Sequence, residues 1–529
     1  MSSSGRRDSL RWAAALFAFS LALSQVACQP PRRSERLVVA SAGKITSLDP
    51  AQASTFDALQ LLSALGDPLY RLDHKGDLEP RLASAPPQIS DGGFTISIPL
   101  RKDVLFHDGT QFNAAAMAFS LRRFLRIGTL NYVVGGRIAA VEEAGPYLLR
   151  LRLTRPSTSL EGLLTSINLT PVSPTAYAKH RNQFLNKQFI GTGPYRLTSF
   201  QTQQQRLEPF QQYWSTEASN AGIDFINLSN STALFGALRS GEVDVLLSNS
   251  LDEDQRLALH RLAKQGKLRE GTGPALEIGY ITLLSNTAPL NQPLLREALA
   301  YSLDRQLMVE RVSYGLRRPL RSLVPPNLQA EPITPWPSYN PQRAKQLLKK
   351  AGYCTTQKLT LPFTFRSNVP ADKLLALTWQ AQVERDLSDC LTLKLNSVES
   401  TTVYRQLGEG AFQAVILEWR GAYPDPEAYL APLLSCSKAN RSVCEEGEAA
   451  ISGSFWTADG LEASLRHSDE LRGPDRLQQL GEIERSAAAG AAYLPIWLVA
   501  PRAWAQLRLS KPEFDGSGQL MLPRLRELH

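Results

Sequence analysis

Short apolar runs with two different periods recur along the chain. Phe94–Leu100 (FTISIPL) and Tyr147–Leu153 alternate apolar with polar residues, which is typical of half-buried strands. Thr55–Leu65 and Ala114–Leu125 carry apolar residues at helical spacing. Asn113 precedes the second of these runs, where its side-chain oxygen can accept a hydrogen bond from a free N–H group of the first helical turn. These patterns predict two strands and two helices.

The same alternation of strands and helices continues to the C-terminal part of the chain. Pro341–Lys350 is expected to be a helix, with a proline in its first turn and Gly352 just beyond its end. Strands that alternate with helices predict an α/β fold. Further strands are expected at Leu37–Ala40, Gly191–Leu197, Val243–Leu247, Ile278–Leu284, Leu359–Phe365, Leu391–Leu395, Phe412–Trp419 and Tyr493–Leu498, and further helices at Ala233–Arg239, Leu294–Leu303, Leu374–Leu387 and Leu477–Ser486.

The N-terminal region has the layout of an export signal. Three arginines precede the apolar run Trp12–Leu23, which is shorter than the about 20 residues of a membrane-spanning helix. A small residue before Cys28 resembles a bacterial lipobox, in which the cysteine is lipidated, although Gln25 stands where that motif usually has leucine. We therefore expect a signal peptide at 1–27 and a lipid-anchored tether at 28–35. Ordinary cleavage nearby, which would leave Cys28 as a free thiol, is the alternative.

Length and charge narrow the class of protein. No later segment approaches 18 uncharged apolar residues, so the mature chain is expected to be soluble. About 490 residues remain after the tether, which are too many for one core and indicate two or three domains. The formal charge is +8, and it is +6 without residues 1–27, which hold three Arg and one Asp. These charges are spread along the chain and not grouped with aromatic residues, which argues against a nucleic-acid partner.

Four of the five cysteines remain if Cys28 is lipidated, and an even number in an oxidising compartment suggests two disulfides. Cys436 and Cys444 enclose a short polar loop and are the natural pair. Cys354 and Cys390 then pair by default, and both precede apolar segments that are expected to be neighbouring strands. None of the spacings is that of a zinc site, so these disulfides are expected to be structural.

The run LRKDVLFHDGTQFNAAAMAF from Leu100 to Phe119 joins the end of a strand to a helix through the strong turn dipeptide Asp108-Gly109. This run resembles the signature of family 5 of the extracellular solute-binding proteins, the oligopeptide, dipeptide and nickel-binding type of ABC importer component. Most of the matching residues are expected to belong to the scaffold. Further matches follow in family order, at Gly191–Tyr195 (GTGPY), Tyr213-Trp214, Leu238–Asp244, Leu295–Leu299 with Leu303–Arg305, Ala344–Tyr353 (AKQLLKKAGY), and Trp419 with Tyr423–Pro426.

The resemblance covers about residues 37 to 518 and implies an α/β, two-lobed, periplasmic-binding-protein-like fold (type II, cluster C). It implies an inserted subdomain in the first lobe and a cleft that closes by hinge bending. The stretch Gly271–Pro274 is the expected first hinge, with an ordinary surface turn as the alternative. The expected parts are lobe I at 36–73, 187–272 and 492–529, the inserted subdomain at 74–186, and lobe II at 273–491.

The resemblance also places the ligand pocket in the segment from Trp419 to Asp425, which follows the apolar run Phe412–Leu417. In peptide-binding relatives the position before Tyr423 is an aspartate that pairs with the free α-amine of the ligand, whereas here it is Ala422. Since a buried ammonium without a carboxylate partner is costly, either Glu418 or Asp425 takes the role or the ligand is not a free-amine peptide. The candidate ligand-binding residues are Trp419, Arg420, Gly421, Ala422, Tyr423 and Asp425.

Three of these side chains have specific expected roles and alternatives. Trp419 and Tyr423 offer flat apolar faces suited to enclosing a ligand, while for Trp419 core packing at the end of a strand is the alternative. Arg420 could bind a carboxylate or a phosphate of the ligand through its planar fork, and a surface ion pair is the alternative.

The implied protein is a periplasmic, lipid-anchored monomer without a cofactor, which delivers a peptide or peptide-like solute to an ABC permease in the cytoplasmic membrane. A non-peptide ligand such as a chelated metal is the alternative, since no group of His, Cys and carboxylates suggests direct metal ligation. A secreted hydrolase is more remote, because the chain lacks the common catalytic motifs and its histidines, among them His107, His180 and His260, are dispersed. A role in signalling or scavenging stays open.

Overall fold

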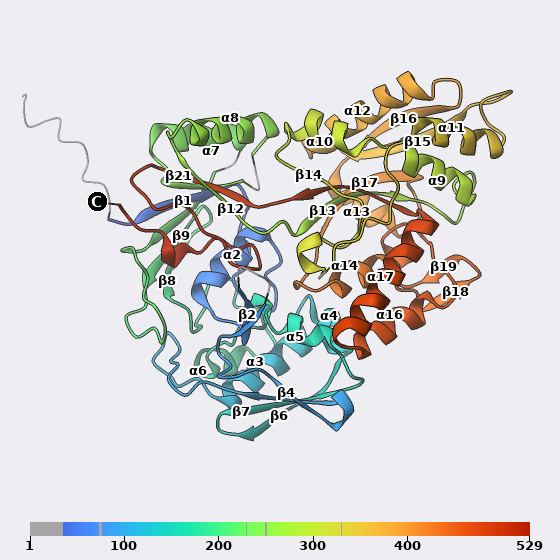
Figure 1. The fold of residues 1–529 in the computed structure, drawn as a ribbon. Helices are drawn as coiled ribbons and strands as arrows, with labels where there is room; N and C mark the ends of the chain where they lie inside the picture. Colours follow the sequence, from blue (N-terminus) through green and yellow to red (C-terminus); the bar gives the residue numbers. More distant parts are fainter. Residues whose placement is uncertain (1–34, 74–76, 229, 249–250, 330, 529) are drawn as a thin grey trace, which may run out of the picture.

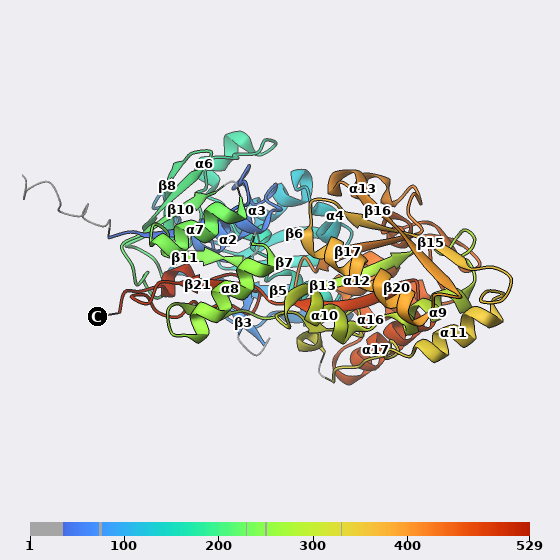
Figure 2. The ribbon, with the colours of Figure 1, turned by 90° about the horizontal axis from the view of Figure 1, so that it is seen from above.

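The computed structural model describes residues 35–73, 77–228, 230–248, 251–329 and 331–528, and it is built around two large sheets and a smaller one (Figure 1). The expected signal peptide and Cys28 lie outside the described residues. Within those ranges no helix has both the length and the apolar character that a membrane crossing requires. Seen from above, the two large sheets lie at opposite ends of an elongated molecule (Figure 2).

The first large sheet has seven strands in the order β12–β21–β11–β1–β10–β9–β8. β1 lies between β10 and β11 and runs parallel to both, while the other neighbours are antiparallel. Helix α2 packs on one face, and α7 and α8 pack on the other. We call these elements lobe I; they are β1 (Leu37–Ser41), α2 (Phe56–Leu65), β8 (Tyr195–Phe200), β9 (Gln204–Pro209), β10 (Ile223–Asn227), α7 (Ser231–Ser240), β11 (Val245–Leu247), α8 (Glu253–Lys264), β12 (Arg269–Thr272) and β21 (Arg502–Ala505).

The second large sheet has six strands in the order β14–β20–β13–β17–β15–β16. One face packs against α9 to α12, and the other faces a second apolar cluster that includes α14, α16 and α17. We call these elements lobe II; they are β13 (Glu277–Leu283), α9 (Pro293–Ser302), α10 (Arg305–Ser313), β14 (Arg318–Pro319), α11 (Pro341–Lys350), β15 (Leu359–Arg366), α12 (Pro370–Asp386), β16 (Leu391–Val398), α13 (Ser400–Leu407), β17 (Ala414–Arg420), α14 (Glu427–Leu434), β18 (Lys438–Asn440), β19 (Val443–Glu446), α15 (Glu448–Ile451), α16 (Leu461–Glu470), α17 (Gly473–Gly490) and β20 (Tyr493–Val499).

The position of β20 differs from the expected end of lobe II at residue 491. This strand pairs with β13, with Ile281 opposite Leu494, so the chain leaves the second sheet only at Val499. An apolar run predicts a strand but not the sheet that the strand joins, which is why the sequence did not reveal this. The two segments that cross between the lobes lie side by side, since Gly273 N–H donates a hydrogen bond of 2.9 Å to the Pro501 carbonyl.

A smaller antiparallel sheet in the order β4–β5–β7–β6, packed against α3, forms an inserted unit below both lobes in Figure 1. Its apolar side chains and those of lobe II belong to one continuous buried cluster. The unit therefore contacts lobe II as well as lobe I. Its elements, together with the short ones around them, are β2 (Tyr70–Leu72), β3 (Leu78–Pro80), β4 (Gln88–Ser90), β5 (Thr95–Pro99), α3 (Ala114–Ile127), α4 (Asn131–Gly135), β6 (Ile138–Gly145), β7 (Leu148–Leu153), α5 (Ser159–Leu163) and α6 (Pro174–Tyr177).

His107 ties two of the sequence motifs together. Its ring accepts a hydrogen bond from Gly191 N–H at Nδ1 and donates one of 3.0 Å from Nε2 to the Gly193 carbonyl. The neighbouring turn is the expected one, with Gly109 at a φ of 81°. The histidine is almost fully buried, and it joins the Asp108-Gly109 turn to the GTGPY segment. These contacts give His107 a role in the fold.

We expect His107 to make the stability of the protein depend on pH. Burial lowers the pKa of His107 to about 4, against the opposing hydrogen bond to Gly193. The unfolded chain, in which a histidine has a pKa of about 6.5, then binds a proton that the folded chain does not, so stability falls as the pH drops from about 6.5 towards 4. In urea titrations, the difference in unfolding free energy between the wild type and His107→Gln should shrink by up to about 3 kcal/mol over this range. A difference that stays constant would contradict this assignment.

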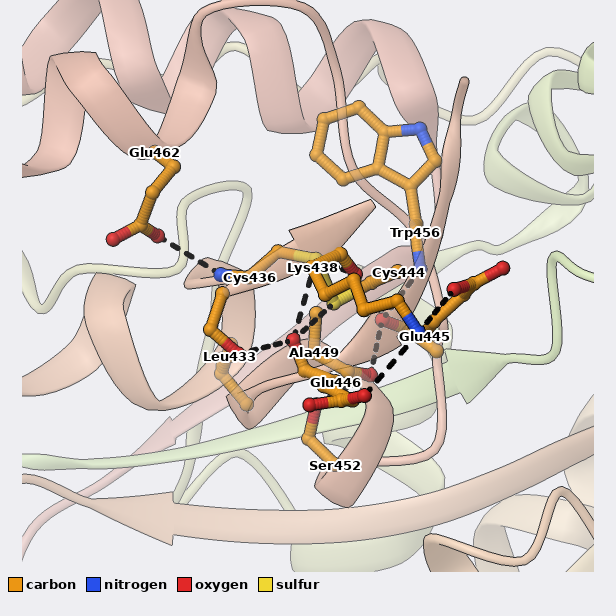
Figure 3. The surroundings of a disulfide bond; sticks show 12 residues. Leu433, Cys436, Lys438, Cys444, Glu445, Glu446, Ala449, Ser452, Trp456 and Glu462 are labelled. Atoms are coloured by element: carbon orange, nitrogen blue, oxygen red, sulfur yellow. Dashed lines mark hydrogen bonds and ion pairs between the residues drawn. A yellow bond between two sulfur atoms is a disulfide. The ribbon is translucent and has the colours of Figure 1, made fainter. Parts of the chain in front are cut away.

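Two disulfides lie in lobe II, and they join the cysteines in the pairs that the sequence suggested. Cys354, just after α11, is bonded to Cys390, just before β16. Cys436 and Cys444 close the hairpin of β18 and β19 (Figure 3). The backbone N–H of Cys436 also donates a hydrogen bond of 2.9 Å to the Glu462 carboxylate of α16, which fixes the hairpin to the helical layer.

Candidate functional site

A cavity of ≈ 550 Å³ lies where lobe I, lobe II and the inserted unit meet. Its walls come from stretches far apart in the sequence. Among them are α2 and its flanks, the end of α3 and the start of α4, the region 163–169, the start of β13, the segment 419–429 and the loop 515–523. Most of the lining side chains are apolar. They include Phe56, Leu59, Phe124, Leu163, Ile167, Leu276, Trp419, Leu520 and Met521.

Five of the six candidate ligand-binding residues line this cavity, namely Trp419, Arg420, Gly421, Ala422 and Tyr423. Asp425 is not among the lining residues. It is buried, and its carboxylate forms a two-point ion pair with Arg476, with distances of 2.7 and 2.9 Å. It also accepts a hydrogen bond from Glu427 N–H. Asp425 thus stabilises the segment 419–429 and does not face the cavity.

The two aromatic candidates, Trp419 and Tyr423, line the cavity and also pack against the protein interior. The indole N–H of Trp419 donates a hydrogen bond of 2.9 Å to the Ala428 carbonyl, and its ring packs against the apolar cluster of lobe II. The hydroxyl of Tyr423 donates to the Glu427 carboxylate, and burial raises the pKa of Tyr423 well above its ordinary value. Both rings are therefore held in place by contacts within the protein, and such preorganisation lowers the entropy cost of binding a ligand.

Arg420 projects from the end of β17 towards lobe I. It donates a hydrogen bond to the Ser517 carbonyl, and its guanidinium carbon lies 5.7 Å from the centre of the Phe56 ring. Among the described residues no carboxylate forms an ion pair with Arg420. The surface ion pair, which was the alternative role expected for Arg420, is therefore not found among these residues. The remaining N–H groups of the fork can bind an anionic group.

Neither of the acids that the sequence offered in place of an aspartate at position 422 is free. Glu418 forms ion pairs with Arg317, at 3.0 Å, and with Arg366, at 3.3 Å. Asp425 is held by Arg476, as described above. Ala422 itself is exposed at the cavity wall. A further carboxylate, to which no sequence motif pointed, is Glu277 at the start of β13, which lines the cavity and lies opposite Arg420 in the strand register.

A second cavity of ≈ 520 Å³ adjoins the first. The two share Phe56, Leu276, Glu277 and Arg420. The walls of the second cavity are more polar, and they include the charged residues Asp252, Glu253, Arg256, Arg317, Glu418 and Arg502 together with the start of α12. Within the described residues no cluster of His, Cys, Asp and Glu has the arrangement of a metal site.

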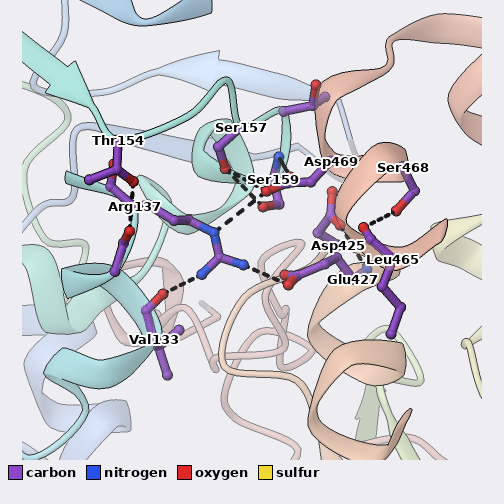
Figure 4. A network of polar contacts seen from close by, with 12 residues as sticks. Val133, Arg137, Thr154, Ser157, Ser159, Asp425, Glu427, Leu465, Ser468 and Asp469 are labelled. Carbon is purple, nitrogen blue, oxygen red and sulfur yellow. Dashed lines mark hydrogen bonds and ion pairs between the residues drawn. The ribbon is translucent and has the colours of Figure 1, made fainter. Parts of the chain in front are cut away.

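A buried polar network connects the inserted unit to lobe II beside the cavity (Figure 4). Arg137 of the inserted unit lies 2.6 Å from a Glu427 oxygen and 3.7 Å from an Asp469 oxygen. Asp469 also accepts hydrogen bonds from Ser157 Oγ and from Ser159 N–H, each of 2.9 Å. Because Glu427 in turn accepts a hydrogen bond from Tyr423, the network reaches the wall of the first cavity.

Comparisons with known proteins agree with this architecture. The family model described as "Bacterial extracellular solute-binding proteins, family 5 Middle" matches residues 77–441. The glutathione-binding protein GsiB of Salmonella choleraesuis is 30% identical over 375 residues, which cover 70% of this chain and 71% of that protein.

Solved structures show the same fold at lower sequence identity. NikA from Brucella suis, in complex with Fe(III)-EDTA, superposes with a TM-score of 0.82 at 20% identity, covering 93% of this chain and 100% of that chain. A dipeptide-binding protein from Pseudoalteromonas sp. SM9913, in complex with Met-Leu, superposes with a TM-score of 0.76 at 21% identity over the same shares of the two chains. The two-lobed α/β fold expected from the sequence is confirmed.

Proposed function

Because this chain belongs to family 5 of the bacterial extracellular solute-binding proteins, we propose that it captures a short peptide or peptide-like solute and delivers it to an ABC permease. The observation that carries this proposal is the cavity of ≈ 550 Å³ between the lobes. Its volume lies within the range of about 300–1,000 Å³ that is usual for small-ligand sites, and its walls are mostly apolar with a few charged groups. A short peptide, with apolar side chains and charged ends, suits such walls.

Capture by closure of the lobes follows from the origin of the cavity walls. Phe56 belongs to lobe I and Trp419 to lobe II, so a ligand that touches both favours the closed arrangement by its differential affinity. We propose the paired crossings at Gly271–Pro274 and 499–502 as the hinge. The proposed parts are lobe I at 36–73, 187–272 and about 500–529, the inserted subdomain at 74–186, and lobe II at 273–499.

The ligand class is suggested by the relatives. The curated relative at 30% identity is named for glutathione, and a structural neighbour holds the dipeptide Met-Leu. We therefore propose peptides of about two to four residues, with the tripeptide glutathione (γ-Glu-Cys-Gly) as the first probe, since a cavity of ≈ 550 Å³ is within the range for ligands of this size. A chelated metal is the competing cargo, which the experiment below distinguishes.

Family 5 proteins act outside the cytoplasm, and the N-terminal pattern supports a more specific location. We propose that residues 1–27 are a signal peptide and that Cys28 is lipidated, which would anchor the monomeric protein to the outer surface of the cytoplasmic membrane. Mass spectrometry of the mature N-terminal peptide tests this, because an unmodified Cys28 would refute the anchor.

Native mass spectrometry of the purified protein, followed by small-angle scattering, tests the proposed function. We expect co-purified masses of short peptides, and a smaller radius of gyration after a peptide from this set is added. A single non-peptide mass, such as a metal chelate, would refute the ligand class. A tight binder that leaves the radius unchanged would refute closure.

A further inference from the structure

The two cavities meet at Glu277 and Arg420, which occupy opposite positions on neighbouring strands. Glu418 lies two residues before Arg420, and side chains alternate between the faces of a strand. The three side chains therefore project from the same side of the β13–β17 pair. Since β13 lies inside the sheet, between β20 and β17, the backbone of Glu277 is held in a fixed position.

Glu277 differs from every other carboxylate that lines the two cavities. Within the described part of the chain, no hydrogen bond or ion pair reaches its side chain, whereas each of the others has a partner. Asp67 pairs with Arg81, Asp515 accepts hydrogen bonds from Ser517 and Gln519, Asp252 accepts one from Ser231, Glu253 pairs with Arg317 and Arg256, and Glu418 pairs with Arg317 and Arg366. Glu277 is thus a carboxylate without a protein partner at the junction of two cavities.

We propose that Glu277 binds the ammonium group of the ligand, so that this protein selects peptides with a free α-amine although Ala422 offers no carboxylate. This inference rests on the proposed function and specifies its ligand. Glu277 is half-buried, so a ligand that fills the cavity removes its carboxylate from water, and a ligand ammonium supplies the ion-pair partner that none of the nearby arginines provides. Arg420 lies opposite Glu277 on the neighbouring strand, and its guanidinium can bind an anionic group of the same ligand beside that ammonium.

The protonation of Glu277 gives this role a distinct pH signature. Burial raises the pKa of Glu277 and the nearby Glu418 carboxylate adds to this, while Arg317, Arg420 and Arg256 oppose it. Glu418 stays ionised, because Arg317 and Arg366 hold its pKa below the ordinary value in spite of burial. The affinity for an ammonium group should therefore rise with pH as Glu277 loses its proton. Because the pKa of Glu277 is raised, this rise should occur at a higher pH than the pH at which a free glutamic acid ionises.

Calorimetric titrations of the full chain can test this role. The probes are γ-Glu-Cys-Gly and a set of di- and tripeptides, each with its N-acetylated form, titrated at several pH values from acidic to neutral. We expect the free-amine form to bind about thirtyfold more tightly than the acetylated form at neutral pH, as is typical of one hydrogen-bonded charge pair. Glu277→Gln should remove both this preference and the pH dependence. Glu409→Gln, an exposed carboxylate in the loop after α13, is the matched control and should change neither.

The outcomes separate this inference from the proposed function. Equal binding of both forms by the wild type, or an unchanged preference and pH profile in Glu277→Gln, would overturn the role of Glu277 and leave peptide capture intact. Binding of a nickel–histidine chelate but of no peptide would overturn both. If Glu277→Gln unfolds at a lower temperature than the wild type, Glu277→Asp decides, because it keeps the charge. It should keep the preference for the free amine with lower affinity, and loss of the preference would refute the proposal.

Discussion

Replacing Arg137 with Met should weaken ligand affinity about 100-fold. In the arrangement described above, where the inserted unit contacts lobe II, this change leaves Glu427 and Asp469 buried without the Arg137 cation, and breaking a buried ion pair in this way typically costs about 3–5 kcal/mol. If the proposed hinge bending separates the inserted unit from lobe II, both carboxylates regain water, so the cost falls mainly on the arrangement in which the two are in contact and the ligand is enclosed. About 3 kcal/mol against closure corresponds to roughly a 100-fold loss of affinity.

The pKa shifts of Glu427 and Asp469 reflect a balance between burial and the groups around them. Burial raises the pKa of Glu427, with Arg137 opposing the shift. Burial acts on Asp469 in the same direction, yet the hydrogen bonds from Ser159 and Ser157 and the charge of Arg137 hold its pKa below the ordinary value. Without Arg137, both carboxylates would favour protonation or exposure to water, and the open form offers that exposure.

Calorimetry with the peptide found by native mass spectrometry measures this effect, and the same interface provides the control. Arg472 of lobe II pairs with Glu161 of the inserted unit at 2.8 Å, but its side chain is about half exposed. Exposed pairs of this kind contribute about 0–1 kcal/mol, so Arg472→Gln should change affinity by no more than about fivefold. Wild-type affinity in Arg137→Met would show that the network takes no part in closure. A large loss of unfolding free energy without ligand would point to a folding defect.

Removing the Cys354–Cys390 disulfide should lower the unfolding free energy by about 4 kcal/mol. The bond closes a loop with a sequence separation of 36, whereas Cys436–Cys444 closes one of 8. In the chain-entropy description, a longer loop restricts the unfolded chain more, which gives about 4 kcal/mol for the first bond and about 2.5 kcal/mol for the second. The first bond also links the region after α11 to the start of β16, where Cys390 belongs to the buried core of lobe II and the half-buried Cys354 packs against that core.

Urea titrations of the double variants Cys354→Ala/Cys390→Ala and Cys436→Ala/Cys444→Ala measure this difference under identical oxidising conditions. The first variant should unfold at the lower urea concentration. The second serves as the matched control, because it removes the same chemical bond from a shorter loop of the same lobe. An equal or reversed order would show that local packing around Cys436, and not loop length, determines the contribution of each bond.

The elements that could be predicted are those whose periodicity is undisturbed. Pro341–Lys350 is found with the predicted bounds, because Asn340 caps its first turn and a proline fixes the start. The strand expected at Ile278–Leu284 is found at Glu277–Leu283. Strand β9 (Gln204–Pro209) escaped prediction, because its side chains are largely polar and an apolar alternation is absent.

The candidate site also has a part that could be predicted from the sequence and a part that could not. The segment from Trp419 to Tyr423 could be located because it belongs to a motif of contiguous residues. Glu277 could not, because its importance depends on the pairing of β13 with β17, and a sequence does not state which strands become neighbours. The ion pairs of Glu418 and Asp425 could not be predicted for the same reason, since their arginine partners lie on elements that are distant in the sequence.

The wide separation of the cavity walls along the sequence has a consequence for how the protein matures. Residues near Phe56 and residues near Leu520 line the same space, and Gln60 holds Leu520 through two hydrogen bonds of 2.8 Å between side chain and backbone. A chain of which only the first lobe segments have condensed therefore has no complete site, because such long-range contacts form only with the whole tertiary structure. Only molecules that have folded completely should therefore bind the solute. A solute present during refolding should stabilise the folded protein, but it should not stabilise the early folding intermediates.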